Sequence, residues 1–342
     1  MTDTRLEAEI VTNAPELARR EPELWELFER DPSATPFQSP AWLLPWVSCF
    51  APSQELRVLF LWCRARLVFV LPLYLESGAE ETVARLVGAA ISDYLGALSD
   101  PAHHTAAVPR AKEFLAALLD EADRIELTDL KRGAVLEAVV RQMPTAACAP
   151  CEPCPRLALR RTLEDHLQQL PFHLRRNLKQ SAARLARRGR VEWRNAGRST
   201  LPSLLAAFFE LHGARFRARG ERGVLADPRV QQFHRLAAPR LLEAGLLSLS
   251  GLFLDDRPIA VASVLRRTEA HLYLTGFDPT IEKVSLGSLL ILHTLGDAIH
   301  AGLAAYDFLR GAEAYKYAWG AEDVYTTRAQ FCAMPKRKAA LR

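Results

Sequence analysis

Two stretches of this chain share one form, and that form limits what the chain can fold into. Residues 56–76 read "LRVLFLWCRARLVFVLPLYLE" and residues 247–267 read "LSLSGLFLDDRPIAVASVLRR". Each has two runs rich in β-forming residues around a short charged break, the pattern of an antiparallel hairpin. A further strand and a helix are expected after each one. The sequence therefore predicts an α/β protein with two similar halves, as a tandem duplication would give.

A proline-rich segment separates the halves. Residues 144–155, "PTAACAPCEPCP", contain four prolines and three cysteines, which favours an extended linker. We predict an N-terminal domain over 1–147, a Cys/Pro linker over 148–155 and a C-terminal domain over 156–342. In polyproline II geometry the thiols of Cys148, Cys151 and Cys154 share one edge about 9 Å apart, so no metal site is expected.

The composition indicates a soluble protein of a reducing compartment. Apolar residues make up 49% and charged residues 25% of the 342 residues, with six cysteines and a net charge of +4. The start of the chain, "MTDTRLEAEIV", has no apolar signal core. The apolar runs are far shorter than the roughly 18 residues that a membrane span needs. We therefore expect a cytoplasmic protein with no membrane span, and the mild charge does not by itself indicate nucleic acid.

A candidate anion site lies where the third strand of the second half leads into a helix over 287–301. The connecting loop holds Lys283, Ser285, Gly287 and Ser288. The first N–H groups of a helix have no intrahelical acceptor and carry partial positive charge, so this position suits a pyrophosphate. The alternative is an ordinary serine cap on a core helix.

A basic helix precedes this region. Residues 173–190 contain seven Lys or Arg and no acidic residue, while Leu174, Leu178, Ala182 and Leu185 form an apolar stripe. One face is expected to pack and the other to be positive. That positive face is either solvated or in contact with the phosphates of a cofactor, a nucleic acid or an anionic substrate.

Two smaller groups are candidates for substrate binding. "ISDYLG" places Ser92, Asp93 and Tyr94 after an apolar run, in a turn or along a cleft between domains. "ELHGARFRARG" places His212, Arg215 and Arg219 roughly on one side of a helix, where surface packing is the alternative.

The order of hairpin, third strand, anion-ready helix and the strand "AYDFLRG" resembles the GNAT acetyltransferase fold. The chain is similar to the CelD-like branch of that superfamily, which is linked to cellulose and exopolysaccharide biosynthesis. It also resembles the Fem-type aminoacyl transferases, which are built from two GNAT-like halves. The motifs that carry the resemblance span residues 35–320 and are "TPFQSPAWLLPW", "ISDYLG", "CPRLAL", "RRNLKQSAARLARRG", "LTGFDP", "SLGSLL" and, most specifically, "YDFLRGAEAYKYAWG".

The resemblance implies two tandem GNAT-like domains packed around a cleft, with mixed central sheets flanked by helices. It implies an enzyme that moves an acyl group, acetyl in the leading interpretation, from acyl-CoA to an amine or hydroxyl acceptor in polysaccharide or cell-envelope biosynthesis. The sequence departs from the usual GNAT pyrophosphate loop, because "KVSLGS" keeps one glycine. The implied cofactor-binding residues are Thr275, Gly276, Lys283, Gly287, Ser288, Leu289 and Lys316.

The same resemblance suggests roles for the final motif. Asp307 and Glu313 are candidates for the general base and Tyr315 for the acid. The expected substrate-binding residues are Ser92, Asp93, Tyr94, Arg175, His212, Arg215 and Arg310. Two rival interpretations stay open. One is a tRNA-dependent aminoacyl transferase of Fem type, with the basic helix on RNA. The other is a non-catalytic GNAT-like binding protein.

Overall fold

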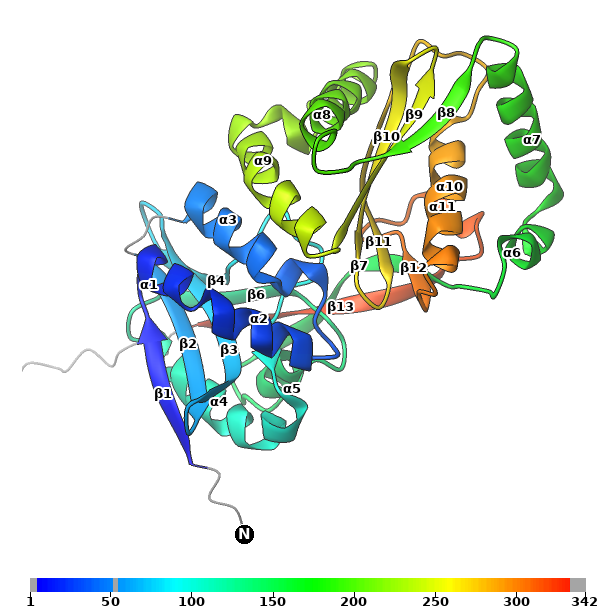
Figure 1. The fold of residues 1–342 in the computed structure, drawn as a ribbon. Helices are drawn as coiled ribbons and strands as arrows, with labels where there is room; N and C mark the ends of the chain where they lie inside the picture. Colours follow the sequence, from blue (N-terminus) through cyan, green and yellow to red (C-terminus); the bar gives the residue numbers. More distant parts are fainter. Residues whose placement is uncertain (1–4, 52–54, 333–342) are drawn as a thin grey trace, which may run out of the picture. The chain divides into compact units, whose positions relative to one another are not determined.

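The computed structural model describes residues 5–51 and 55–332. The chain divides into two compact units. Unit 1 runs up to Cys151 and also takes the segment that starts at Tyr325, and unit 2 covers Glu152–Val324. Each unit combines a sheet with flanking helices (Figure 1). The predicted mixed α/β fold is confirmed.

Unit 1 is built around one hairpin and a helical crossover. Strands β2 and β3 pair antiparallel and close at Cys63 and Arg66, with Arg64 in a left-handed turn conformation (φ 57°). β4 and β6 are parallel and are joined through α4. The sheet order is β1-β2-β3-β4-β6-β13, with β5 on β3. The elements are β1 (Leu6–Val11), α1 (Ala14–Arg19), α2 (Glu21–Arg30), α3 (Pro40–Phe50), β2 (Leu56–Cys63), β3 (Arg66–Ser77), β4 (Thr82–Leu86), β5 (Leu98–Ser99), α4 (His104–Leu118), β6 (Arg124–Leu130), α5 (Val135–Arg141) and β13 (Glu322–Cys332).

Unit 2 repeats this plan. The β9–β10 hairpin turns through Asp255 and Asp256, both with positive φ (48° and 67°), a conformation that Asp tolerates and that suits tight hairpin turns. β11 and β12 are parallel and are joined through α10. The sheet order is β7-β12-β11-β10-β9-β8. The elements are β7 (Ala147–Ala158), α6 (Leu163–Gln169), α7 (Phe172–Ala186), β8 (Val191–Asn195), α8 (Leu201–Arg217), α9 (Pro228–Glu243), β9 (Leu247–Leu254), β10 (Arg257–Arg266), β11 (Ala270–Phe277), α10 (Leu286–His300), β12 (Ala305–Asp307) and α11 (Ala314–Tyr317).

Helices cover both faces of the unit 2 sheet. α8 and α9 lie on one face, and α10, backed by α7, lies on the other (Figure 1). α7 packs through Leu174, Leu178, Ser181 and Leu185. The predicted stripe is therefore confirmed at its leucines, but Ser181 takes the inward position expected of Ala182, which is exposed.

Two strands run across the unit boundaries along the chain: β7 begins in unit 1 and continues into unit 2, and β13 begins in unit 2 and continues into unit 1. β7 follows α5 of unit 1, yet it pairs with β12 through Leu157 and Tyr306. β13 follows α11 of unit 2, yet it pairs with β6 through Phe331 and Ile125. Unit 1 therefore takes its strand next to β6 from the far end of the chain.

The segment expected to be a polyproline linker is part of strand β7. Proline lacks an N–H but keeps its carbonyl, so it can still accept hydrogen bonds from a neighbouring segment. The carbonyl of Pro155 accepts from the Phe308 N–H at 2.9 Å, and that of Pro153 accepts from the Gly311 N–H at 3.0 Å. The cysteines do not share one edge, because side chains alternate along a strand and the three-residue spacing puts Cys151 on the face opposite Cys148 and Cys154.

Candidate active site

The β11 and β12 strands form a fork at the centre of unit 2. They pair only through Ala270 with Tyr306 and His271 with Asp307, and β11 then continues to Phe277. A bulge at Tyr273, where the β10 partners step from Leu274 to Leu272, turns β11 near this point. Tyr273, Leu274 and Thr275 are partly exposed although β11 is a central strand. The fork therefore leaves a length of β11 backbone for an extended ligand to pair with.

The motif that follows β12 folds into a turn around Lys316. This lysine is buried, and its Nζ donates to the carbonyls of Leu309 (3.0 Å), Arg310 (2.7 Å) and Gly311 (3.0 Å). It also lies 2.9 Å from Oε2 of Glu313. Its ammonium thus holds the turn closed, which assigns Lys316 to the turn rather than to cofactor phosphate.

Asp307 helps to shape the same turn. Its side chain is buried, with Oδ1 accepting from the Leu309 N–H at 2.7 Å and Oδ2 3.7 Å from Nδ1 of His271. Leu309 takes a left-handed conformation (φ 58°), which this bond supports. These contacts favour a positioning role for Asp307.

Helix α8 brings Arg215 to the end of β11. Nη1 of Arg215 donates to Oγ1 of Thr275 at 2.7 Å, and its guanidinium lies 4.9 Å from the centre of the Phe277 ring. Burial and the positive charge of Arg219 lower the pKa of Arg215, while Tyr315 and Glu313 raise it. Two of the predicted substrate residues, His212 and Arg215, therefore lie beside β11, although His212 is fully buried.

Gly276 belongs to the packing of α8 on the sheet. A Cβ at this position would lie 2.4 Å from the backbone nitrogen of His212. Its lack of a side chain serves the helix contact, so it carries no evident cofactor role.

Glu313, a candidate general base, and Tyr315, the candidate acid, are both accessible to solvent. The Glu313 side chain is 57% exposed and Tyr315 is 43% exposed, so both can meet a ligand. Partial burial, reinforced by the charge of Glu313, raises the pKa of Tyr315 to about 12. The phenol therefore keeps its proton at neutral pH. Its ring packs edge-on to Phe308 at 6.3 Å.

Near the start of α10, two backbone N–H groups have no hydrogen-bond acceptor among the described residues. The Leu286 N–H donates to Val284 and the Leu289 N–H to Ser285. Over residues 5–51 and 55–332, neither Gly287 nor Ser288 has an acceptor for its N–H. Ser285 makes no side-chain cap. A Cβ at Gly287 would meet only the Phe277 ring, at an ordinary 3.6 Å. The predicted anion position therefore has donors that protein atoms leave unused.

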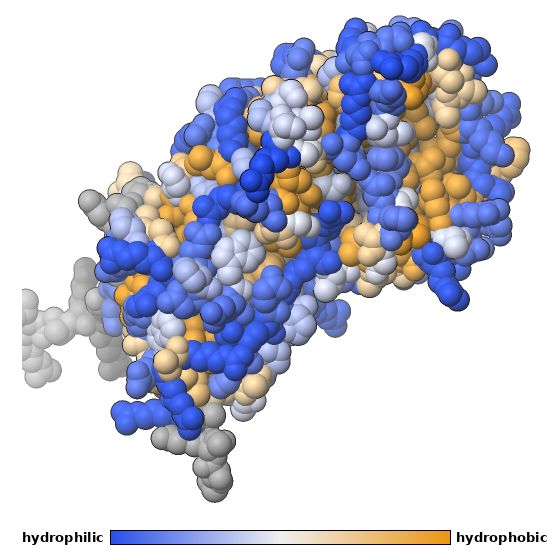
Figure 2. Space-filling model, in the orientation of Figure 1, coloured by the Kyte–Doolittle hydropathy of each residue, from blue (hydrophilic) through white to orange (hydrophobic). Residues whose placement is uncertain are grey.

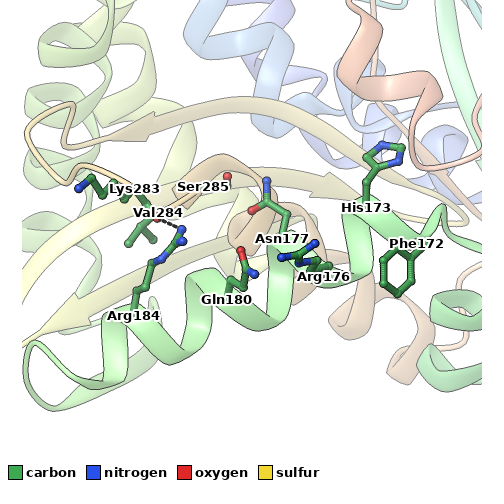
Figure 3. A pocket seen from close by; sticks show the side chains of 9 residues that line it. All are labelled: Phe172, His173, Arg176, Asn177, Gln180, Arg184, Lys283, Val284 and Ser285. Atoms are coloured by element: carbon green, nitrogen blue, oxygen red, sulfur yellow. Dashed lines mark hydrogen bonds between the residues drawn. The ribbon is translucent and has the colours of Figure 1, made fainter.

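A cavity of about 470 Å³ lies between α7 and the loop before α10. Figure 3 shows Phe172 and His173 at one end and Arg184 with Lys283 at the other. Nη1 of Arg184 donates to the Lys283 carbonyl at 2.7 Å, and Lys283 is left-handed (φ 62°). The lining residues are Phe172, His173, Arg176, Asn177, Gln180, Arg184, Lys283, Val284 and Ser285.

Several predicted residues belong to other parts of the structure than the fork. Ser92 and Tyr94 belong to the interior of unit 1, where Oγ of Ser92 accepts from Nε1 of Trp42 at 2.9 Å. Asp93, between them, is half-buried in unit 1. Arg175 lies on α7 but does not line the cavity. In the turn that follows β12, Arg310 is half-buried.

Leu289 faces a different hollow, of about 800 Å³, beside Trp193 and His293. Figure 2 shows apolar surface there, over α10 and between the polar residues of α7 and strand β8.

A largely buried group of titratable side chains lies where β11 and β12 pair. The ligand atoms of Glu269, His271 and Asp307 are within 4.8 Å of one another, close enough for a metal ion. Arg156, however, binds Glu269 through Nη2 at 2.7 Å and Nε at 3.2 Å. A guanidinium beside the carboxylates disfavours the binding of a metal ion there. We therefore assign the group to an ion-pair network.

Of the residues that line the cavity, the sequence pointed to Lys283 and Ser285 but not to the individual residues of α7. Phe172, Arg176, Gln180 and Arg184 recur every four residues, so they form one row on α7. That spacing was visible in the sequence. The loop that faces this row was not, because its position depends on the packing of α7 on α10.

Part of the chain matches the model of a known protein family. Residues 173–317, which lie within unit 2, match the family model of the acetyltransferase (GNAT) domain. No curated protein matches the sequence. In the structure that is described, no helix is both long and apolar enough to span a membrane.

Among solved structures, the chain is similar to FemX, with 11% identity, a TM-score of 0.67, and coverage of 96% of this chain and 98% of FemX. L-PGS from Bacillus licheniformis shares 10% identity, covering 92% and 91%, with a TM-score of 0.57. A tandem GNAT protein from the clavulanic acid biosynthesis pathway shares 16% identity, covering 97% and 100%, with a TM-score of 0.53. The chain is therefore similar in fold to GNAT-type acyltransferases, and its residues 173–317 are similar to a GNAT acetyltransferase domain.

Proposed function

We propose that this chain transfers an acyl group from acyl-CoA to an amine or hydroxyl acceptor at the fork between β11 and β12. The observation that carries the proposal is the pair of N–H groups without an acceptor at Gly287 and Ser288, next to the part of β11 that extends beyond its two pairs with β12. A diphosphate fits the amides at a helix start. The amide-rich arm of a coenzyme A molecule fits the exposed strand edge.

The residues around the fork supply the remaining chemistry. The acceptor attacks the thioester carbonyl, Glu313 takes the acceptor proton, and the carbon–sulfur bond breaks. Tyr315, which stays protonated at neutral pH, donates a hydrogen bond to the departing thiolate. The thiolate then regains a proton from Glu313 or solvent, which leaves acylated acceptor and free coenzyme A. Arg215 is placed to stabilise negative charge near Thr275.

Titration calorimetry with acetyl-CoA, longer acyl-CoAs and tRNA tests the proposal. We expect acetyl-CoA to bind wild type, and Gly287→Val to lose most of that affinity, because a side chain there occupies the approach to the vacant amides. Gly287→Ala should keep or raise the melting temperature, since its Cβ makes only an ordinary contact and alanine favours a helix. Unchanged affinity in Gly287→Val would place the site elsewhere.

Transfer of an aminoacyl group from tRNA is the second candidate function. The positive face of α7 and the similarity to FemX support it. Binding of charged tRNA without binding of any acyl-CoA would favour this function. Binding of neither would favour a non-catalytic GNAT-like protein. A role in polysaccharide or cell-envelope biosynthesis rests on the CelD-like motifs, and neighbouring genes would test it.

A further inference from the structure

The outward side of helix α7 carries a line of five exposed side chains. They recur at intervals of three or four residues, as one face of a helix requires. The buried row of the same helix has the same spacing and begins two residues later, at Leu174, so the two rows lie roughly opposite each other. We call the exposed set the outer ridge, and its members are Phe172, Arg176, Lys179, Ala183 and Arg187.

The cations of the outer ridge make no contact that the fold needs. Over residues 5–51 and 55–332, the side chains of Arg176, Lys179 and Arg187 form no hydrogen bond and no ion pair. Two other arginines of this segment instead donate to backbone carbonyls of the loop before α10, so they hold the helix in place. Helix α7 has no acidic residue that could neutralise the ridge. Three positive charges therefore face outward along roughly 17 Å of helix.

Phe172 adds an apolar ring at the start of the ridge. Its side chain is 72% exposed, the largest exposure among the large hydrophobic residues that the structure describes. Figure 3 shows the ring at the end of α7 that lies away from the 283–285 loop. Burial of a phenyl ring in an apolar phase is favourable. A partner that offers negative charge next to an apolar phase therefore fits the whole ridge.

An apolar hollow lies beside α7 on the same side of the unit 2 sheet. Its volume is about 800 Å³, and it reaches from Ala182 on α7 to Trp193 on β8. Helix α10 lines it with Leu289, Leu292 and Ile299, which belong to the apolar surface seen there in Figure 2. The basic ridge thus has an apolar surface next to it, and the two together suit an amphipathic partner.

Duplex RNA fits this surface less well than a lipid bilayer does. The major groove of an A-form helix is deep and narrow, so the side chains of a protein helix do not reach its base edges. Its phosphates match the three cations but leave Phe172 and the hollow without an apolar partner. Helices that lie in a membrane interface, by contrast, combine basic side chains with an aromatic residue. Anionic headgroups attract Lys and Arg that lie near the surface.

We propose that the outer ridge of α7 docks unit 2 onto the surface of an anionic lipid bilayer. Arg176, Lys179 and Arg187 lie along the phosphate headgroups, and Phe172 inserts between the headgroups at one end of the ridge. The apolar surface beside Ala182 adds to the contact. This inference goes beyond the proposed acyl transfer and does not depend on the acyl donor. Docking of this kind concentrates the protein at a membrane without a spanning helix.

Co-sedimentation of the full chain with lipid vesicles tests the charged part of the ridge. We expect binding to phosphatidylcholine vesicles that contain about one-third phosphatidylglycerol, no binding to pure phosphatidylcholine, and weaker binding as salt is added. Lys179→Gln combined with Arg187→Gln should weaken binding about 25-fold, or roughly fivefold for each cation removed. The matched control combines Arg217→Gln with Arg235→Gln, at exposed arginines of α8 and α9 on the opposite face of the same sheet, and should bind as wild type does.

A second set of variants tests the aromatic end of the ridge. Phe172→Ala should weaken vesicle binding about tenfold, and Phe172→Trp should restore it, because an indole ring favours the membrane interface. Leu236→Ala removes an exposed apolar side chain from α9 and should leave vesicle binding unchanged. All of these side chains are exposed, so each variant should keep the melting temperature of wild type.

Several outcomes would overturn the inference. Wild type might fail to distinguish anionic from neutral vesicles, or the two double variants could lose equal affinity. Glycerol 3-phosphate tests for a site that takes a free phosphate: at equal ionic strength it should displace the protein from vesicles no better than sodium chloride does. Stronger displacement would assign the cations to a soluble ligand. A loss of tRNA binding in the Lys179 and Arg187 variant, with vesicle binding unchanged, would assign the ridge to RNA.

Discussion

At the scale of single residues, the turn after β12 depends on one buried ammonium. Lys316 satisfies three carbonyl oxygens that would otherwise be left without donors as the chain passes through two positive-φ residues, Leu309 and Gly311. A buried carbonyl left without its donor typically costs about 1–3 kcal/mol.

We therefore expect Lys316→Met to lower the free energy of unfolding by about 3 kcal/mol. Lys316→Arg should rescue little of it, because a planar guanidinium cannot follow three convergent carbonyls. Chemical denaturation measures both variants. Lys283→Met, at an exposed lysine of the same unit, is the control and should change stability by less than about 0.5 kcal/mol. A Lys316→Met protein as stable as that control would contradict the assignment.

Asp307 gives a second prediction at this scale. Because its oxygens face the Leu309 N–H and His271, Asp307→Asn should lower the melting temperature, with a loss of about 1–2 kcal/mol. Turnover per folded molecule should change by less than about threefold, measured as thiol release from acetyl-CoA with a panel of amine and hydroxyl acceptors. A general base would behave in the opposite way. Removal of a base lowers turnover by about 10²-fold or more and leaves folding intact.

The sequence indicates that "YDFLRGAEAYKYAWG" forms a special turn. It does not indicate which of its residues stabilise the turn and which are accessible to a ligand. The sequence predicts that Asp307, Glu313, Tyr315 and Lys316 are close together. Which of them face inward depends on the reversal of the chain at Leu309, a leucine in a left-handed conformation that no local signal predicts. Phe277, which links Arg215 to the start of α10, was missed for a similar reason.

At the scale of elements, helices α8 and α9 each bury a histidine in the neutral form. Burial, with the charge of Arg215, lowers the pKa of His212 to about 4, and burial with a smaller effect of His212 lowers that of His234 to about 3. In the unfolded chain a histidine titrates near about 6.5. Below that pH the unfolded chain therefore binds protons that the folded chain refuses. Stability is complete above about pH 6.5 and falls as the pH drops toward 4.

Between pH 7 and pH 5 we expect each of these histidines to reduce the free energy of unfolding by about 2 kcal/mol. His212→Gln cannot take up a proton, so its stability should depend on pH less steeply by that amount. Denaturation curves at the two pH values measure the difference. His300→Gln replaces an exposed histidine and should keep the wild-type slope. Equal slopes in wild type and His212→Gln would show that the buried ring does accept a proton.

Most helices and strands could be predicted from the spacing of apolar residues along the sequence alone. The hairpins, the helices near 201–217 and 286–300 and the strand at 124–130 follow the expected patterns. Strand β7 does not follow the expected pattern, because its prolines are typical of a linker. Their carbonyls nevertheless accept hydrogen bonds from the turn after β12. Pairing partners of that kind lie about 150 residues away, so no local rule could find them.

At the scale of the whole molecule, the position of β13 in the chain decides what can fold alone. A division of the chain after residue 151 separates unit 1 from β13. That strand supplies the buried Phe331 and Ala329 and pairs with β6. Thr327 also donates from Oγ1 to Oε1 of the buried Glu137 at 3.0 Å. Without β13 the core of unit 1 is incomplete and β6 is left as an open edge, a template for aggregation.

We therefore expect a fragment of residues 1–151 to aggregate or to melt without a cooperative transition. A synthetic peptide of residues 322–332 added in trans should restore that transition, because it returns the strand that the sheet lacks. A scrambled peptide of the same composition is the control, since it has the same charge but cannot place Ala329 and Phe331 on the inner face. Circular dichroism during heating, over a series of peptide concentrations, measures the rescue. A melting temperature that rises with the authentic peptide alone would support the assignment of β13 to unit 1. Cooperative melting of residues 1–151 without any peptide would show that the first unit is complete without β13 and that the pairing with β6 is dispensable.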